Sequence, residues 1–154
     1  EQSYHFVYLH MISKLIDFID TFVIILKKKS AQQLTFLHVF HHSTIGVIWC
    51  YLLEYGYAFG SITFGALLNS FVHCVMYSHY LISVLNIRNP FKQYVTRLQM
   101  VQFAVLLLHS ILFALYETVN GGPWQLQLFY QTGMLFLFGN FSRKRYGGKQ
   151  RKNE

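Results

Sequence analysis

Three histidines, His38, His41 and His42, lie in the apolar segment LHVFHHSTIG, which contains no Lys, Arg, Asp or Glu. In a helix, spacings of three and four residues place all three imidazoles within an arc of about 100°. Two kinds of chemistry suit this cluster. His at i and i+4 can bind one metal ion, and neutral imidazole can act as an acid, a base or a nucleophile. Packing explains one such histidine well and three poorly.

A second polar group interrupts the apolar segment SKLIDFIDTFVIIL. Lys14, Asp17, Asp20 and Thr21 fall within one helical sector roughly 120° wide. Ionisable groups at membrane depth normally face a protein interior or a watery cavity. A structural Lys14–Asp17 ion pair is the alternative explanation, but it leaves Asp20 unexplained.

The segment NSFVHCVMYSHYLIS carries a polar and aromatic stripe at helical spacing. Its members are Asn69, His73, Met76, Tyr77 and Tyr80, with His79 near the edge. Aromatic residues and Met at this spacing are usually core packing. Asn and His on the same stripe favour the lining of a cavity instead.

Two further segments repeat this pattern with glutamines. Thr96, Gln99 and Gln102 step by three residues, His109 continues their face, and Gln127 and Gln131 lie one turn apart. Hydrogen bonds between membrane helices are the alternative role for such glutamines. Because several segments each present a polar stripe, we expect the stripes to line one shared chamber.

The composition indicates which elements position these residues. Of 154 residues, 53% are hydrophobic and 12% are charged, about half the charged share of soluble domains. Five apolar stretches follow one another, at 4–26, 34–53, 61–85, 98–116 and 124–141. Each is near the roughly 20 residues that cross a bilayer as a helix. The sequence therefore predicts an all-α, polytopic transmembrane domain over residues 1–142, followed by a basic tail at 143–154.

The net charge of +7 is distributed in a way that argues against nucleic acid as a partner. Basic residues lie in alternate connections: Lys27, Lys28 and Lys29; Arg88, Lys92 and Arg97; Arg143, Lys144, Arg145, Lys149, Arg151 and Lys152. The positive-inside rule then places the C-terminus in the cytosol and residue 1 on the opposite side of the membrane.

Four motifs, in order, resemble the ELO family of very-long-chain fatty-acid elongases. KLIDFIDT resembles K-x-x-E-x-x-D-T, HVFHH resembles H-x-x-H-H, NSFVHCVMYSHY resembles N-x-x-H-x-x-M-Y-x-Y-Y, and TRLQMVQ resembles T-x-x-Q-x-x-Q. The similarity extends from Lys14 to Gln102. There are two departures from the pattern: Asp17 stands where the family has Glu, and His79 where it has Tyr.

The resemblance implies a seven-helix fold around a substrate tunnel, of which this chain would supply the third to seventh spans as part of a longer protein. It implies the condensation of an acyl-CoA with malonyl-CoA to a 3-oxoacyl-CoA two carbons longer, with release of carbon dioxide and CoA. The implied setting is the endoplasmic reticulum membrane. No metal or other cofactor is expected. Self-association and contact with other enzymes of the elongation cycle are expected.

The resemblance also assigns roles to the residues. His41 would carry the acyl group, His38 and His42 would orient it or handle protons, and Asn69 and His73 would stabilise developing negative charge. The remaining motif residues would bind substrate: Lys14, Asp17, Asp20, Thr21, Met76, Tyr77, Tyr80, Gln99 and Gln102.

Three alternatives remain at this level. A di-iron lipid desaturase or hydroxylase also uses H-x-x-H-H, but it needs further His clusters. Cys74 could be the condensing nucleophile, although it lies about 100° from His73 around a helix. A non-enzymatic transporter could line its path with the same polar stripes.

Overall fold

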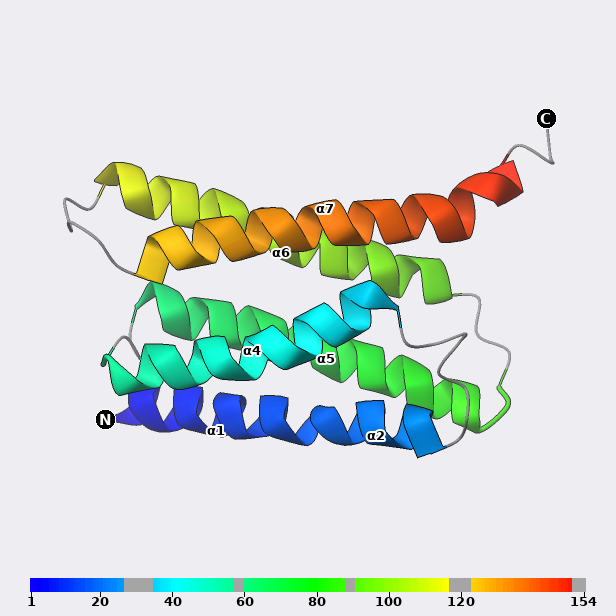
Figure 1. Cartoon of the computed structure of the whole chain (residues 1–154), viewed down its shortest axis with the longest axis horizontal. Coiled ribbons are helices and arrows are strands. Elements are labelled where there is room, and N and C mark those ends of the chain that lie inside the picture. The colour runs from blue at the N-terminus through cyan, green and yellow to red at the C-terminus, as the bar shows by residue number, and fades with distance from the viewer. Residues whose placement is uncertain (27–34, 57–59, 88–90, 117–122, 151–154) are drawn as a thin grey trace. The chain divides into compact units, whose positions relative to one another are not determined.

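The computed structural model describes residues 1–26, 35–56, 60–87, 91–116 and 123–150. Every regular element in these ranges is an α-helix, which confirms the predicted fold class. The helices are α1 (Gln2–Ile16), α2 (Phe18–Leu26), α4 (Phe36–Glu54), α5 (Ser61–Val84), α6 (Lys92–Tyr116) and α7 (Pro123–Gln150) (Figure 1).

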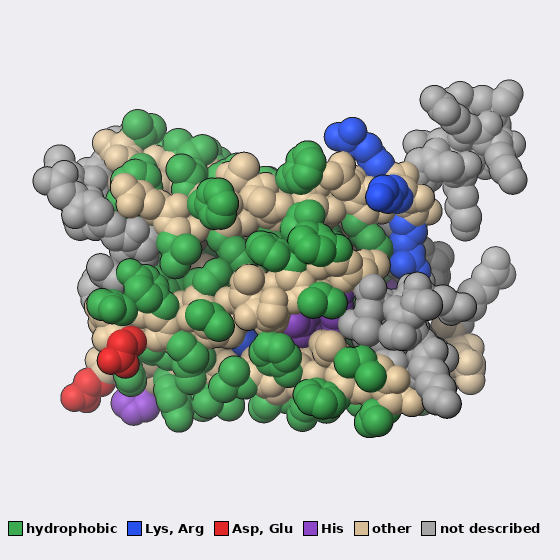
Figure 2. All heavy atoms as spheres, viewed as in Figure 1, with side chains coloured by type: hydrophobic (Ala, Val, Ile, Leu, Met, Phe, Trp, Pro, Cys, Tyr) green, Lys and Arg blue, Asp and Glu red, His purple; other side chains and the backbone are tan. Residues whose placement is uncertain are grey.

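The described helices are apolar over much of their surface. Two of them, α4 and α6, are long and apolar enough to cross a membrane. Large hydrophobic side chains such as Val101, Leu108 and Leu115 on α6 are exposed, and Figure 2 shows hydrophobic side chains distributed across the visible face. Such a surface suits lipid better than water, because contiguous apolar patches of this extent are rare on soluble monomers.

Three helix boundaries differ from the sequence-based ranges. The first predicted span is two helices, since Asp17 separates α1 from α2. Helix α6 begins at Lys92 rather than near residue 98, and α7 continues to Gln150 rather than ending near 141. Lys, Arg and Gln are good helix formers, so the polar flanks of both apolar stretches extend the helices.

The chain divides into two compact units, residues 1–66 and 67–154. In the first unit, α1 packs against α4. His10 of α1 contacts Trp49 late in α4, whereas Phe18 at the start of α2 contacts His42 early in α4, so the segment formed by α1 and α2 runs antiparallel to α4. The buried apolar residues include Val7.

Gly46 marks a close approach between α4 and the junction of α1 and α2. A Cβ atom built there would lie 3.4 Å from Cδ2 of Leu15 and 3.7 Å from Cε2 of Phe18. A larger side chain at this position would therefore push the two helices apart. The glycine positions α1 and α2 directly beside the histidine segment of α4.

In the second unit, α6 packs against α7. The rings of Phe103 and Phe138 lie 5.2 Å apart between these two helices. Leu106 and Ser110 on α6 and Met134 on α7 are almost fully buried. The α5 residues of this unit carry the polar stripe predicted from the sequence.

Candidate active site

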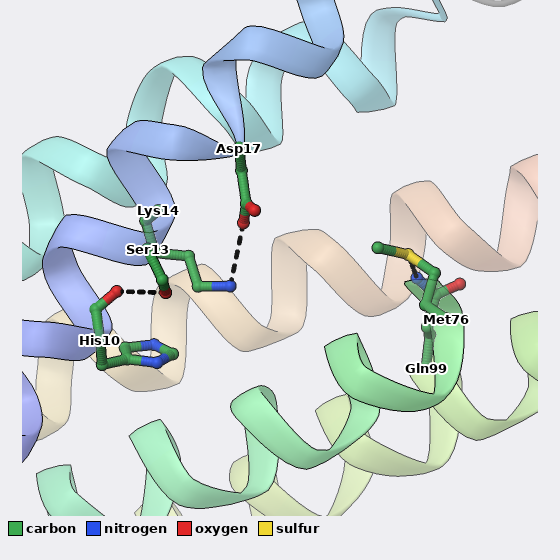
Figure 3. A network of polar contacts seen from close by, with 6 residues as sticks. All are labelled: His10, Ser13, Lys14, Asp17, Met76 and Gln99. Carbon is green, nitrogen blue, oxygen red and sulfur yellow. Dashed lines mark hydrogen bonds and ion pairs between the residues drawn. The ribbon is translucent and has the colours of Figure 1, made fainter. Parts of the chain in front are cut away.

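Lys14 of α1 and Asp17, the residue that caps the end of this helix, form an ion pair inside the first unit. Nζ of Lys14 lies 3.1 Å from Oδ2 of Asp17, and the two side chains are 2% and 10% exposed (Figure 3). The pair lies where the helix is interrupted, although Asp17 keeps helical dihedral angles and its N–H donates to the carbonyl of Ser13. The predicted ion pair is thus present. The side chain of Asp20 lies outside the described part of the structure.

Thr21 connects α2 to the histidine segment. Its hydroxyl lies 3.0 Å from Nε2 of His38, within hydrogen-bond distance. On α4, Thr35 is the N-cap, and its side-chain oxygen accepts a hydrogen bond from the backbone N–H of His38 at 3.2 Å. A side-chain cap of this kind stabilises the first turn of the helix, in which His38 lies. His38 is therefore held at both its backbone and its ring.

The three histidines of α4 form one ring cluster. The rings of His38 and His42 are stacked, with centroids 4.2 Å apart, and His41 meets His42 nearly edge-on at 5.5 Å. The ring of Phe18 meets that of His42 edge-on, with the ring centroids 6.2 Å apart. All three histidines are half-buried. The predicted common face is confirmed, and contacts from α2 hold His38 and His42 while His41 lies beside them.

The second unit positions the residues of the α5 stripe. Asn69 is 8% exposed, and its side-chain oxygen has no hydrogen-bond partner among the described residues. His73, Met76 and Tyr77 are half-buried. Tyr80 differs from the expectation, because its side chain is 51% exposed. Every residue from 80 to 87 is exposed, so the position near the end of α5, rather than the helix face, determines this.

His79 replaces the first tyrosine of the family motif and is buried, at 8% exposure. The sequence analysis placed it at the edge of the stripe. Its ring lies 6.1 Å from that of Tyr80, tilted by 55°. Cys74, the alternative nucleophile, is exposed. The structure thus turns Cys74 away from the buried face that carries Asn69.

Helix α6 contributes a polar face to the second unit. Thr96 and Gln102 are buried, at 8% and 4% exposure, and Gln99 is half-buried. Nε2 of Gln99 lies 3.4 Å from Sδ of Met76, which joins α6 to the α5 stripe (Figure 3). Two predicted substrate-binding residues therefore contact each other. The convergence of all polar stripes in one chamber stays a prediction.

Metal binding was the other chemistry open to these histidines. Within the described ranges, no group of three His, Cys, Asp or Glu side chains has an arrangement that could hold a metal ion. A groove of about 340 Å³ lies between α1 and α4, and none of the predicted site residues lines it. Its lining residues are Tyr4, Tyr8, Met11, Cys50, Leu53 and Glu54.

The sequence analysis missed His10. This residue is 3% exposed and lies on the same face of α1 as Lys14, one turn earlier. Its ring meets that of Trp49 at 4.6 Å with an interplanar angle of 78°. The spacing of four residues to Lys14 was the available signal, but it falls outside the family motif.

Comparison with known sequences identifies the family. Residues 1–154 match the sequence model of the ELO family, described as the GNS1/SUR4 family. The chain belongs to this family. The resemblance inferred from four motifs is therefore confirmed over the whole chain. As an ELO protein with apolar helices able to cross a bilayer, it is a membrane protein.

Similar curated proteins carry elongase names. The ELO chain is 45% identical to fatty acid elongase 5 of Leishmania major over 141 residues, which are 91% of this chain and 56% of that protein. It is 51% identical to fatty acid elongase 4 of Trypanosoma brucei brucei, over 87% of this chain and 53% of that protein. It is 37% identical to very long chain fatty acid elongase 5 of Xenopus tropicalis, over 89% of this chain and 47% of that protein. The chain spans about half the length of these relatives.

Proposed function

We propose that this chain carries the condensing site of a fatty-acid elongase. The site would join an acyl-CoA to malonyl-CoA, giving a 3-oxoacyl-CoA two carbons longer with release of carbon dioxide and CoA. The names of its relatives support an elongase. The observation that carries the proposal is the ring cluster of α4, which Thr21 and Phe18 fix from the neighbouring helix.

The first chemical step would form an acyl-imidazole on His41. A ring nitrogen attacks the thioester carbonyl, the carbon–sulfur bond breaks, and the proton of the other ring nitrogen passes to the CoA thiolate. Neutral imidazole can attack without prior deprotonation, which a hydroxyl group cannot easily do. His42, edge-on to His41 and stacked on His38, would fix its orientation.

The second step would form the new carbon–carbon bond. Malonyl-CoA loses carbon dioxide to leave an enolate, and the enolate carbon attacks the acyl-imidazole. The bond to His41 breaks, and a proton from solvent restores the neutral ring. Asn69 and His73 would stabilise the enolate oxygen through hydrogen bonds, the kind of electrostatic contribution that is often the largest in catalysis.

Basic residues would receive the anionic CoA headgroup. Arg97 lies six residues before Phe103 on α6, and Lys144 lies six after Phe138 on α7, so the ring contact places both at one end of the helix pair. Both side chains are exposed, and Figure 2 shows Lys and Arg side chains gathered at one end of these helices. By the positive-inside rule, this end would face the cytosol. The membrane would be that of the endoplasmic reticulum.

An elongation assay tests the proposal directly. The purified full-length protein is incubated with radiolabelled malonyl-CoA and a panel of acyl-CoAs, and we expect labelled products two carbons longer. Activity that persists after chelation supports the two CoA thioesters as sufficient reactants; activity lost on chelation and restored by iron would favour a desaturase or hydroxylase. The absence of any labelled product across the panel would refute the elongase assignment. Self-association and contact with other elongation enzymes stay predictions.

A further inference from the structure

His10 lies outside the motif that begins at Lys14, yet it shares the buried face of that motif. Counted over the whole residue, His10, Lys14 and Asp17 are 3%, 2% and 8% exposed. Spacings of four and three residues align them along α1, and Figure 3 shows all three side chains leaving the same side of the helix. The buried polar face of α1 thus extends one turn closer to the N-terminus than the motif, which begins at Lys14.

Two contacts join the segment formed by α1 and α2 to α4, one on each side of the ion pair. On one side, the ring of His10 meets Trp49 at 4.6 Å. On the other, the hydroxyl of Thr21 meets His38 at 3.0 Å. The two contacts are eleven residues apart both along the segment formed by α1 and α2 and along α4, which is about three turns of helix. The Lys14–Asp17 ion pair therefore lies between two contacts with α4.

The region between these two contacts is closely packed. Gly46 of α4 lies against Leu15 and Phe18, with no room for a side chain larger than a methyl group. Lys14 is 2% exposed, so its stem and ammonium group are surrounded by protein. Close-packed interiors transmit displacements rather than absorbing them. A change at His10 should therefore reach Lys14 and the neighbouring histidines of α4.

We propose that His10 is a positioning residue of the elongase site, acting through Lys14. Its imidazole, held edge-on by Trp49, fills the space one turn below the Lys14 stem and fixes the register of α1 against the histidine segment. Removing the ring would leave a cavity there, into which the lysine side chain could turn away from Asp17. This inference rests on the proposed function, because the quantity it predicts is the rate of condensation.

The test compares three variants of the full-length protein in the elongation assay. His10→Ala removes the ring, and His10→Phe keeps an aromatic ring against Trp49. Val7→Ala is the matched control, because Val7 is fully buried on the same face one turn farther from Lys14. We expect His10→Ala to lower kcat about tenfold or more, since small misplacements of reacting groups have effects of that size. The KM of His10→Ala should change little. His10→Phe should recover most of the lost kcat, and Val7→Ala should have the kcat of the unmodified protein.

An unchanged kcat in His10→Ala, an equal loss in Val7→Ala, or a loss confined to KM would each overturn the inference. If His10→Ala does not accumulate as folded protein, Trp49→Leu and Trp49→Phe provide the same comparison from the α4 side. Failure of the unmodified protein to elongate any acyl-CoA would count against the proposed function. Normal elongation by both the unmodified protein and His10→Ala would count against the role of His10 alone.

Discussion

The hydroxyl of Thr21 lies 3.0 Å from Nε2 of His38, 17 positions later in the sequence, so one hydrogen bond joins two motifs. One motif carries the buried ion pair of α1, and the other carries the histidine cluster of α4. The same His38 ring stacks on His42 at 4.2 Å. Thr21 is therefore one of the contacts that orient the cluster from α2, together with Phe18.

Thr21→Val should show how much this contact contributes. Valine keeps the volume of threonine but removes the hydroxyl, and loss of one such hydrogen bond costs about 1 kcal/mol of stability. We expect a larger proportional effect on kcat, about tenfold, because the His38 ring loses its fixed orientation. Thermal unfolding in detergent and the elongation assay measure the two effects, and Thr21→Ser, which keeps the hydroxyl, is the control. Equal activity in the Val and Ser variants would contradict the prediction.

The Lys14–Asp17 pair should respond differently to single and double replacement. Lys14→Met or Asp17→Leu alone removes one half of the ion pair and keeps the other charge buried, which is typically destabilising by about 3–5 kcal/mol. The double variant Lys14→Met/Asp17→Leu removes both charges, and we expect it to recover most of the lost stability. It should not recover elongation if the pair also organises the substrate site.

Measuring thermal unfolding and elongation on the same preparations separates these roles. Asp17→Glu is the control, because it keeps the charge and restores the residue typical of the family motif. Recovery of elongation together with stability in the double variant would show that the pair is purely structural. Additive losses of stability in the double variant would contradict the ion pair itself.

The sequence was sufficient to predict the helical fold, because uninterrupted apolar stretches leave few alternatives to helices in a membrane protein. The grouping of His38, His41 and His42 also followed from spacing alone. The break at Asp17 could not be predicted in this way, since Asp and Phe carry no strong signal for ending a helix. The exposure of Tyr80 depends on its place near the end of α5, which helical phase does not report.

His10 shows a second limit of sequence-based inference. One histidine in an apolar helix is usually a packing residue, and the motif begins only at Lys14. Its importance became visible when the ring of Trp49, 39 residues later in the sequence, was found against it. Periodicity identifies the face of a helix, but it cannot identify the residue on a neighbouring helix that the face contacts.

Asn69 should combine lost activity with retained stability. Its buried side-chain oxygen has no hydrogen-bond partner within the described ranges, so replacing it by an apolar group removes an unsatisfied acceptor. Such acceptors are destabilising by roughly 1–3 kcal/mol. We expect Asn69→Leu to unfold at the same or a higher temperature while kcat falls sharply.

Gln131→Leu is the matched control for this experiment. Gln131 is also 8% exposed, and its side-chain oxygen likewise has no partner among the described residues, but it belongs to none of the four family motifs and has no role assigned in the condensation. We expect the same effect on stability with elongation retained. Equal loss of activity in both variants, or marked destabilisation by Asn69→Leu, would argue that Asn69 is a packing residue.

Gly46 should tolerate one methyl group and no more. Alanine is favoured over glycine inside a helix by up to about 1 kcal/mol, and its Cβ would make ordinary contacts at 3.4 and 3.7 Å with Leu15 and Phe18. We expect Gly46→Ala to be as stable as the unmodified protein or slightly more so. Gly46→Leu would overpack the contact and should lose about 1–3 kcal/mol. Thermal unfolding measures both, and a stable, active Leu variant would show that α1 and α4 are not closely packed here.

His41→Ala tests the proposed nucleophile most directly. With radiolabelled acyl-CoA and no malonyl-CoA, the unmodified protein should retain label that hydroxylamine releases, because acyl-imidazoles react readily with amines. His41→Ala should retain none, and its elongation rate should fall by roughly a thousandfold or more, as when other enzymes lose a nucleophile. His5→Ala is the control, since His5 is exposed at the start of α1 and contacts a backbone carbonyl. Label that persists in His41→Ala would move the acyl group to another residue, and His38 and His42 would then be the nearest imidazoles to replace.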